Sequence, residues 1–240
     1  MAVTEAVTRL ALIRRDYEQH RPTTFIGDFD LPTDTKTGLL TNHLALLCGV
    51  IADQSMAASK AWQLPAQLCQ RTGQAELTAV WLATHETTML AAIQQRPALH
   101  RFPTTMAHYL SELGRRLVMA HDGDADALLA VTDYQTLLDR LQPFLGVGLK
   151  KVNALLLILV LDEHRHLTGL ENSQALYDGH LQHILGDELN QRITQKTATT
   201  WCQKIDPTFP AQVSPYLWRL DRAHETLQDV VERQTKEAPI

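Results

Sequence analysis

Apolar side chains recur at intervals of three and four residues along most of the chain, which is the spacing of one face of an α-helix. The segments with this spacing are 39–50, 77–82, 89–93, 106–118, 134–141, 152–161 and 213–231. No segment alternates apolar and polar residues for more than a few positions, as a half-buried strand would. The pattern predicts an all-α protein.

Local signals show where these helices start and stop. Pro103, followed by two threonines, predicts the start of a helix, and Asp122-Gly123 predicts its end. The segment 22–34 is rich in Pro, Thr, Gly and Asp, and the segment 162–172 holds charges, two histidines and a glycine. Both segments are predicted to be loops.

Composition limits the class of protein. The chain has 240 residues, 45% hydrophobic and 20% charged, which is enough for one globular unit or two small lobes that share a groove. The longest wholly apolar run, 154–161, is far shorter than the roughly 18–20 residues of a membrane span. The first ten residues contain an acid and no hydrophobic signal core, so we expect a cytoplasmic protein that does not bind membranes.

The three cysteines are too few and too far apart for most cysteine sites. Cys48, Cys69 and Cys202 are odd in number and never closer than 21 residues. This disfavours a disulfide framework, a zinc knuckle and a four-cysteine iron–sulfur cluster, so we expect no metal and no cofactor. The net charge of −5 argues against non-specific coating of nucleic acid but leaves room for a local basic footprint.

The segment FLGVG, at 144–148, joins two predicted helices. The glycines on either side of its valine predict a tight hairpin that only glycine can form. The helix that follows would present free backbone N–H groups, which is a site for phosphate. The only charges between residues 140 and 161 are positive: Arg140, Lys150 and Lys151. The residues alone are equally compatible with an ordinary helix–turn–helix corner that carries two solvated lysines.

This segment resembles the helix-hairpin-helix of the endonuclease III (HhH-GPD) superfamily of DNA glycosylases. Further similarity lies in GVIADQS at 49–55, PALHRFP at 97–103 and DPTFP at 206–210. The last of these resembles a bacterial subgroup of glycosylase-like proteins, and the cysteines of the iron–sulfur cluster found in many relatives are missing here. Roughly residues 37–226 can be laid along the family without large gaps.

The resemblance implies two helical lobes with DNA across the groove between them. Residues 37–161 would form a six-helix bundle that contains the hairpin, and residues 1–36 plus 162–240 would form the second lobe from both ends of the chain. The hairpin residues Leu145, Gly146, Val147 and Gly148, with Lys151, would contact the DNA backbone. Gln54 would fill the gap left by a flipped base, although a local turn amide is the simpler interpretation.

The resemblance implies two catalytic residues. Lys150 stands two residues after the second hairpin glycine, where strand-cleaving relatives have their lysine nucleophile; the alternative is a phosphate contact. Asp178, in LYDGHL, matches the family's aspartate before a helix, with Gly179 where the family has threonine. Its carboxylate would stabilise positive charge on the sugar, or simply cap the helix. Asp162 is the weaker candidate.

Other candidate residues are interpreted as structural. His180 and His183 lack a third convergent ligand and are predicted to be surface histidines. The four tryptophans stand among apolar neighbours, so core positions are predicted for Trp62, Trp81, Trp201 and Trp218.

The sequence therefore predicts a monomeric base-excision DNA glycosylase with AP lyase activity. Its partner would be double-stranded DNA with a damaged base or an abasic site. An oxidised purine, an oxidised pyrimidine and an alkylated purine all remain open as the excised base. The rival interpretations are a non-catalytic DNA-binding relative and a helical protein-interaction module.

Overall fold

The computed structural model describes residues 2–237, with side chains from residue 8 onward. Within this range the regular structure is helical and no strand is formed; Asp133 and Thr168 make one isolated parallel bridge. The all-α class is confirmed. No described helix combines the length and the apolar character that crossing a bilayer requires.

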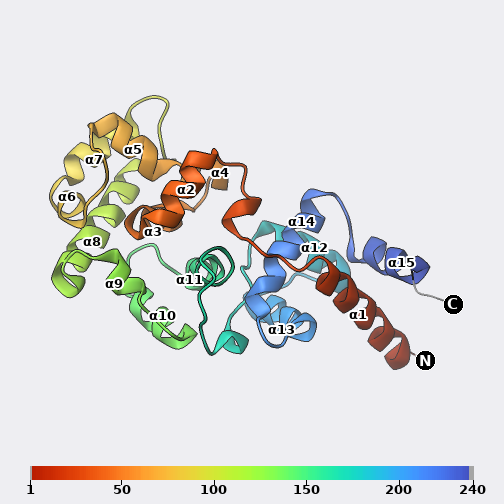
Figure 1. Ribbon diagram of the computed structural model, residues 1–240. Coiled ribbons are helices and arrows are strands. Elements are labelled where there is room, and N and C mark those ends of the chain that lie inside the picture. The colour runs from red at the N-terminus through yellow and green to blue at the C-terminus, as the bar shows by residue number, and fades with distance from the viewer. Residues whose placement is uncertain (1, 238–240) are drawn as a thin grey trace.

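The helices form two groups (Figure 1). The group called here the first lobe contains α2 (Thr33–Thr41), α3 (His43–Ala52), α4 (Ala58–Ala61), α5 (Leu64–Thr72), α6 (Ala79–Thr84), α7 (Glu86–Gln94), α8 (Pro103–His121), α9 (Ala125–Leu129), α10 (Tyr134–Leu141) and α11 (Leu149–Leu157). The second lobe contains α1 (Ala2–Gln19), α12 (Gly179–Leu189), α13 (Gln195–Ile205), α14 (Val213–Arg222) and α15 (Leu227–Glu237). The first and last helices therefore lie at the same end of the molecule.

Capping residues explain most helix boundaries. Pro103 begins α8 and Asp122 ends it in the left-handed conformation, as predicted. The predicted segment 39–50 is divided into α2 and α3 because the Asn42 side chain accepts a hydrogen bond from the backbone N–H of Ala45. The predicted segment 213–231 is also two helices, α14 and α15, with His224 left-handed between them.

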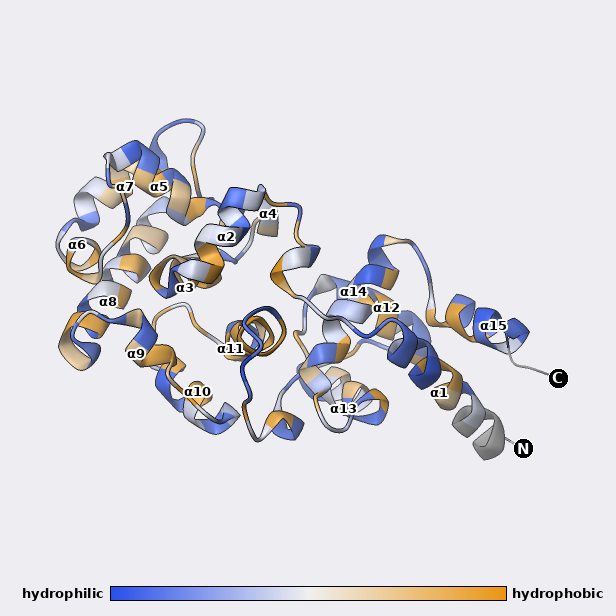
Figure 2. Cartoon of the chain, viewed as in Figure 1, coloured by the Kyte–Doolittle hydropathy of each residue, from blue (hydrophilic) through white to orange (hydrophobic). Residues whose placement is uncertain are grey.

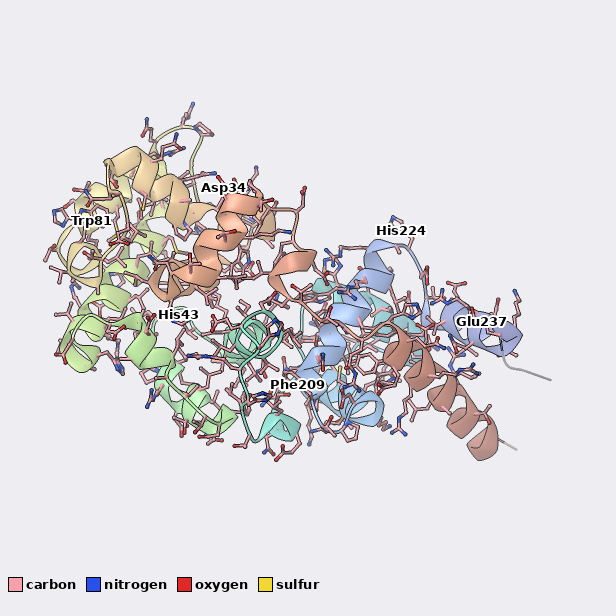
Figure 3. The ribbon with its side chains drawn as sticks, in the orientation of Figure 1. Asp34, His43, Trp81, Phe209, His224 and Glu237 are labelled. Carbon is pink, nitrogen blue, oxygen red and sulfur yellow. The ribbon has the colours of Figure 1, made fainter. Side chains whose placement is uncertain are left out.

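Each lobe contains a cluster of buried apolar residues that forms its core. The first cluster runs through α3, α8 and α11, and Figure 2 shows the coils of α11 mostly in the hydrophobic colour. The second cluster combines Ile13 and Tyr17 of α1 with residues of α12 to α15. Leu176 and Phe209, from the part of the chain after α11, belong to the first cluster; Phe209 is labelled near the middle of the molecule in Figure 3.

The segment between α1 and α2 crosses from one lobe to the other. Its residues Phe25, Ile26 and Leu31 are buried in the first cluster, although the sequence analysis assigned residues 1–36 to the second lobe. The Asp162 carboxylate accepts hydrogen bonds from the Thr24 hydroxyl and from the backbone N–H groups of Phe25 and Ile26. Asp162 is therefore a capping residue of this crossing segment.

Candidate active site

A cavity of about 380 Å³ lies where the crossing segment, the first lobe and the second lobe meet. Its walls come from chain segments that are far apart in the sequence: Phe29 and Asp30; Asp53, Met56, Ala57, Ala58 and Ser59; Lys150; Asp178 and His180; and Trp218 and Arg222. The volume falls within the range of small-molecule sites. The cavity combines two aromatic rings with three carboxylates and a lysine.

The cavity brings Lys150 and Asp178 together. Lys150 lies in the first turn of α11, and its Nζ is 3.2 Å from Oδ2 of Asp178. Asp178 is the N-cap of α12, and its Oδ1 accepts the backbone N–H groups of His180 and Leu181 at 3.0 and 3.2 Å. One carboxylate thus caps a helix with one oxygen and pairs with the lysine through the other.

Trp218 is a further residue of this site. Its indole N–H donates to Oδ1 of Asp178 at 3.2 Å, and the Lys150 Nζ lies 5.8 Å from the centre of its ring, within the range of a cation–π contact. Trp218 packs against both buried clusters, as the sequence predicted for a core residue, but it also lines the cavity. Helical periodicity alone gave no signal for this second role.

Asp53 lies on the first-lobe wall of the cavity, at the C-cap of α3. Burial raises the pKa of its carboxyl group, and the nearby ammonium groups of Lys150 and Lys151 act in the opposite direction. A carboxylate at the C-terminal end of a helix also meets the negative end of the helix dipole. An aspartate directly after a predicted helix is the signal in the sequence that could have identified Asp53.

Lys151 does not line the cavity. Its Nζ donates to the Ile51 carbonyl at 2.6 Å, which caps the last turn of α3, and burial lowers the pKa of the amine to about 8. The family resemblance implied that Lys151 contacts the DNA backbone. The geometry instead makes Lys151 a link between α3 and α11.

The hairpin at 144–148 requires glycine at one of its two glycine positions. Gly146 has φ +77°, and a Cβ there would lie 2.5 Å from the Tyr109 ring. Gly148 has φ −105° and ψ 179°, and a Cβ there would meet no atom within 4 Å. The expectation that both glycines are needed for the turn was wrong for Gly148. Its position next to open space leaves the backbone at the start of α11 accessible.

The other hairpin residues differ in burial: Phe144 is buried in the first cluster, Val147 is half-buried against it, and Leu145 is exposed. The Val147 backbone N–H donates to the Phe144 carbonyl at 3.2 Å, which closes the turn. Leu145 is 39% exposed, which is unusual for a leucine among the described residues of this protein. The site predicted to grip a phosphate is therefore formed by exposed backbone and one exposed apolar side chain.

Gln54 follows Asp53 in the turn after α3 and is half-buried. Its backbone N–H donates to the Ala52 carbonyl at 2.7 Å, but its side chain does not line the cavity. His180 and His183 each place Nδ1 2.5 Å from the Asp221 carboxylate. No three His, Cys, Asp or Glu side chains in the described part of the chain are arranged to hold a metal ion.

No known protein family, curated protein or solved structure matches this chain. Function is therefore inferred from the chemistry of the cavity and the hairpin.

Proposed function

We propose that this protein is a DNA glycosylase with AP lyase activity, which removes a damaged base from double-stranded DNA. The observation that carries the proposal is the contact between Lys150 and Asp178 inside a cavity, with Lys150 in the first turn of α11. An amine beside a carboxylate is the pair needed to attack a sugar carbon and to stabilise the charge that develops there.

The chemistry begins with the transfer of a proton from the Lys150 ammonium to Oδ2 of Asp178. The free amine attacks C1′ of the flipped nucleotide, and the bond between C1′ and the base breaks, with its electron pair leaving on the base. The nitrogen loses a proton, and the bond between C1′ and O4′ breaks as O4′ takes the proton held by Asp178, which gives a Schiff base between Lys150 and C1′. The Asp178 carboxylate then takes a proton from C2′, and the bond between C3′ and the 3′ phosphate oxygen breaks by β-elimination.

Backbone groups of the hairpin account for most of the proposed DNA binding. Arg140 is engaged within the first lobe, because its guanidinium donates to the carbonyls of Ala127, Leu128 and Ala130. Lys151 is engaged with the Ile51 carbonyl. The phosphate would therefore contact the N–H groups at the start of α11, which favour an anion, and Gly148 leaves room for its approach.

Trapping of an abasic-site duplex with borohydride tests the proposal. The wild type should form a covalent adduct, because borohydride reduces the Schiff base, and Lys150→Gln should form none. Lys60, an exposed lysine outside the cavity lining, provides the control: Lys60→Gln should be trapped like the wild type.

Three results would contradict the proposal in different ways. Equal trapping of Lys150→Gln and the wild type would remove Lys150 as the nucleophile. Duplex binding without any trapping or base release would assign a non-catalytic DNA-binding protein. A protein that binds no duplex at low salt would be a helical protein-interaction module.

A further inference from the structure

Two carboxyl groups of the cavity, Asp53 and Asp30, have no part in the chemistry above, and Asp53 is the more buried of the two. Asp53 lies on the wall formed by the first lobe, while Asp178 belongs to the second lobe. Each ammonium group beside Asp53 already has another partner: Lys150 pairs with Asp178, and Lys151 donates to the Ile51 carbonyl. Asp53 therefore lines the cavity without forming a salt bridge to either lysine.

We propose that Asp53 is a second catalytic carboxyl group, which in its protonated form donates its proton to the base as that base departs. The inference rests on the proposed glycosylase function. It follows from the placement of Asp53 and Lys150 on the walls of one cavity, so that a base held between them can be attacked at its sugar and protonated on its ring.

In this step the Lys150 nitrogen forms a bond to C1′, and the bond between C1′ and the base nitrogen breaks. The electron pair of that bond moves into the base, and a ring heteroatom of the base takes the proton from the Asp53 carboxyl. The base leaves neutral, and Asp53 is left as a carboxylate facing the new positive charge on the Lys150 nitrogen. Water that enters the open cavity returns the proton.

The surroundings of Asp53 act on the pKa of its carboxyl in both directions, and the net change is upward. Burial raises the pKa of the carboxyl, and the Asp178 carboxylate acts in the same direction. Lys150 and Lys151 lower it, and the buried Trp62 indole also acts on Asp53 to lower it. The remaining charged or titratable groups that line the cavity are Asp30, His180 and Arg222.

The other carboxylates of the cavity fit this role less well. Both oxygens of Asp178 already accept hydrogen bonds, from Lys150, from Trp218 and from the first turn of α12. Asp30 is exposed to solvent. Asp53 alone among the three is half-buried without being the acceptor in a salt bridge to either neighbouring lysine of α11.

Base release and the trapping of abasic DNA together distinguish a catalytic role of Asp53 from a structural one. Asp53→Asn should slow base release in single turnovers by on the order of 100-fold, which is typical for loss of a general acid. Duplexes that contain 8-oxoguanine, 5-hydroxyuracil or 7-methylguanine serve as probes. Borohydride trapping of an abasic-site duplex should stay within about twofold of the wild type, because no base departs in that reaction.

Asp139→Asn is the matched control, because Asp139 is an exposed carboxylate on α10 that does not line the cavity. It should leave both rates unchanged. Unchanged base release by Asp53→Asn would overturn the proposal, and so would an equal loss of trapping, which would indicate a structural defect. A wild type that neither traps abasic DNA nor releases any of the three bases would instead refute the glycosylase function itself.

A titration of the carboxyl groups by ¹³C NMR requires no substrate. The signal that is lost in Asp53→Asn should titrate above the ordinary aspartate range near 3.9. A midpoint within that range would overturn the proposal even if none of the three bases is released.

Discussion

Oδ1 of Asp178 accepts the indole N–H of Trp218 at 3.2 Å, which leaves Oδ2 of the same carboxylate for Lys150. The hydrogen bond ties α14 to the N-terminus of α12. The hydrogen bond also fixes the orientation of the carboxylate, because each of its two oxygens contacts a different partner.

The variant Trp218→Phe keeps an aromatic ring in the cavity but removes the N–H donor. We expect it to lower the free energy of unfolding by about 1 kcal/mol, which is typical for loss of one hydrogen bond. Trapping of abasic DNA should slow as well, because Asp178 is then free to rotate away from Lys150. Chemical denaturation and trapping rates check both effects, and a normal trapping rate would show that the indole N–H does not position the carboxylate.

Asp178 can be tested with two variants that separate its two roles. Asp178→Asn should retain the helix cap, because asparagine caps as well as aspartate, but lose the charge that faces Lys150. Base release should fall by on the order of 100-fold or more with little change in stability. Asp178→Ala should lose the charge and about 1 kcal/mol of stability. If Asp178→Asn releases base at the wild-type rate, Asp178 is only a cap.

The hairpin glycines should respond differently to alanine. Gly146→Ala should cost about 1–2 kcal/mol for the left-handed backbone, and more because its Cβ meets the Tyr109 ring. Gly148→Ala should leave thermal stability unchanged and weaken binding to a duplex with a tetrahydrofuran abasic site, because its Cβ would stand where a phosphate approaches. Unchanged affinity of Gly148→Ala would show that DNA does not contact this end of α11.

The contacts of His43 with two carboxylates predict that the stability of the fold depends on pH. Its ring nitrogens lie 2.6 Å from Oδ1 of Asp126 and 3.0 Å from Oε1 of Glu163, and the hydrogen bond with Glu163 raises the pKa of His43 above 6.5. Its protonated form therefore stabilises the folded state fully below pH about 6.5, and this contribution is lost as the pH rises through the raised pKa. His43, labelled on the first lobe in Figure 3, joins α3 to α9 and to the segment after α11.

The variant His43→Gln should melt several degrees below the wild type at pH 6, and the difference should shrink by pH 9. Differential scanning calorimetry over this range measures it. A difference that stays constant with pH would mean that the histidine stabilises the fold by packing rather than by charge.

The sequence predicted the helical class, the boundaries of α8 and the hairpin because those features depend on local spacing and on residues such as Pro103 and Gly146. The meeting of Lys150 and Asp178 was expected only through a family resemblance, since 28 residues separate them. Trp218 and Asp53 were missed. Their roles arise from packing between lobes, and periodicity within one helix contains no information about that packing. The same limit applies to Lys151, whose direction is set by the carbonyl at the end of α3.

The assignment of α1 to the same lobe as α12–α15 has a consequence for synthesis on the ribosome. The first lobe and its hairpin can fold while the rest of the chain is still being made, whereas α1 packs against α13 and α15 and must wait for them. Asp178 emerges just before α12, and Trp218 emerges only with α14, so Lys150 acquires its two contacts one after the other. A translation product that stops before Asp178 would present the Lys150 amine and the hairpin without the two groups that contact the amine, so under the proposed function such a chain should trap abasic DNA poorly.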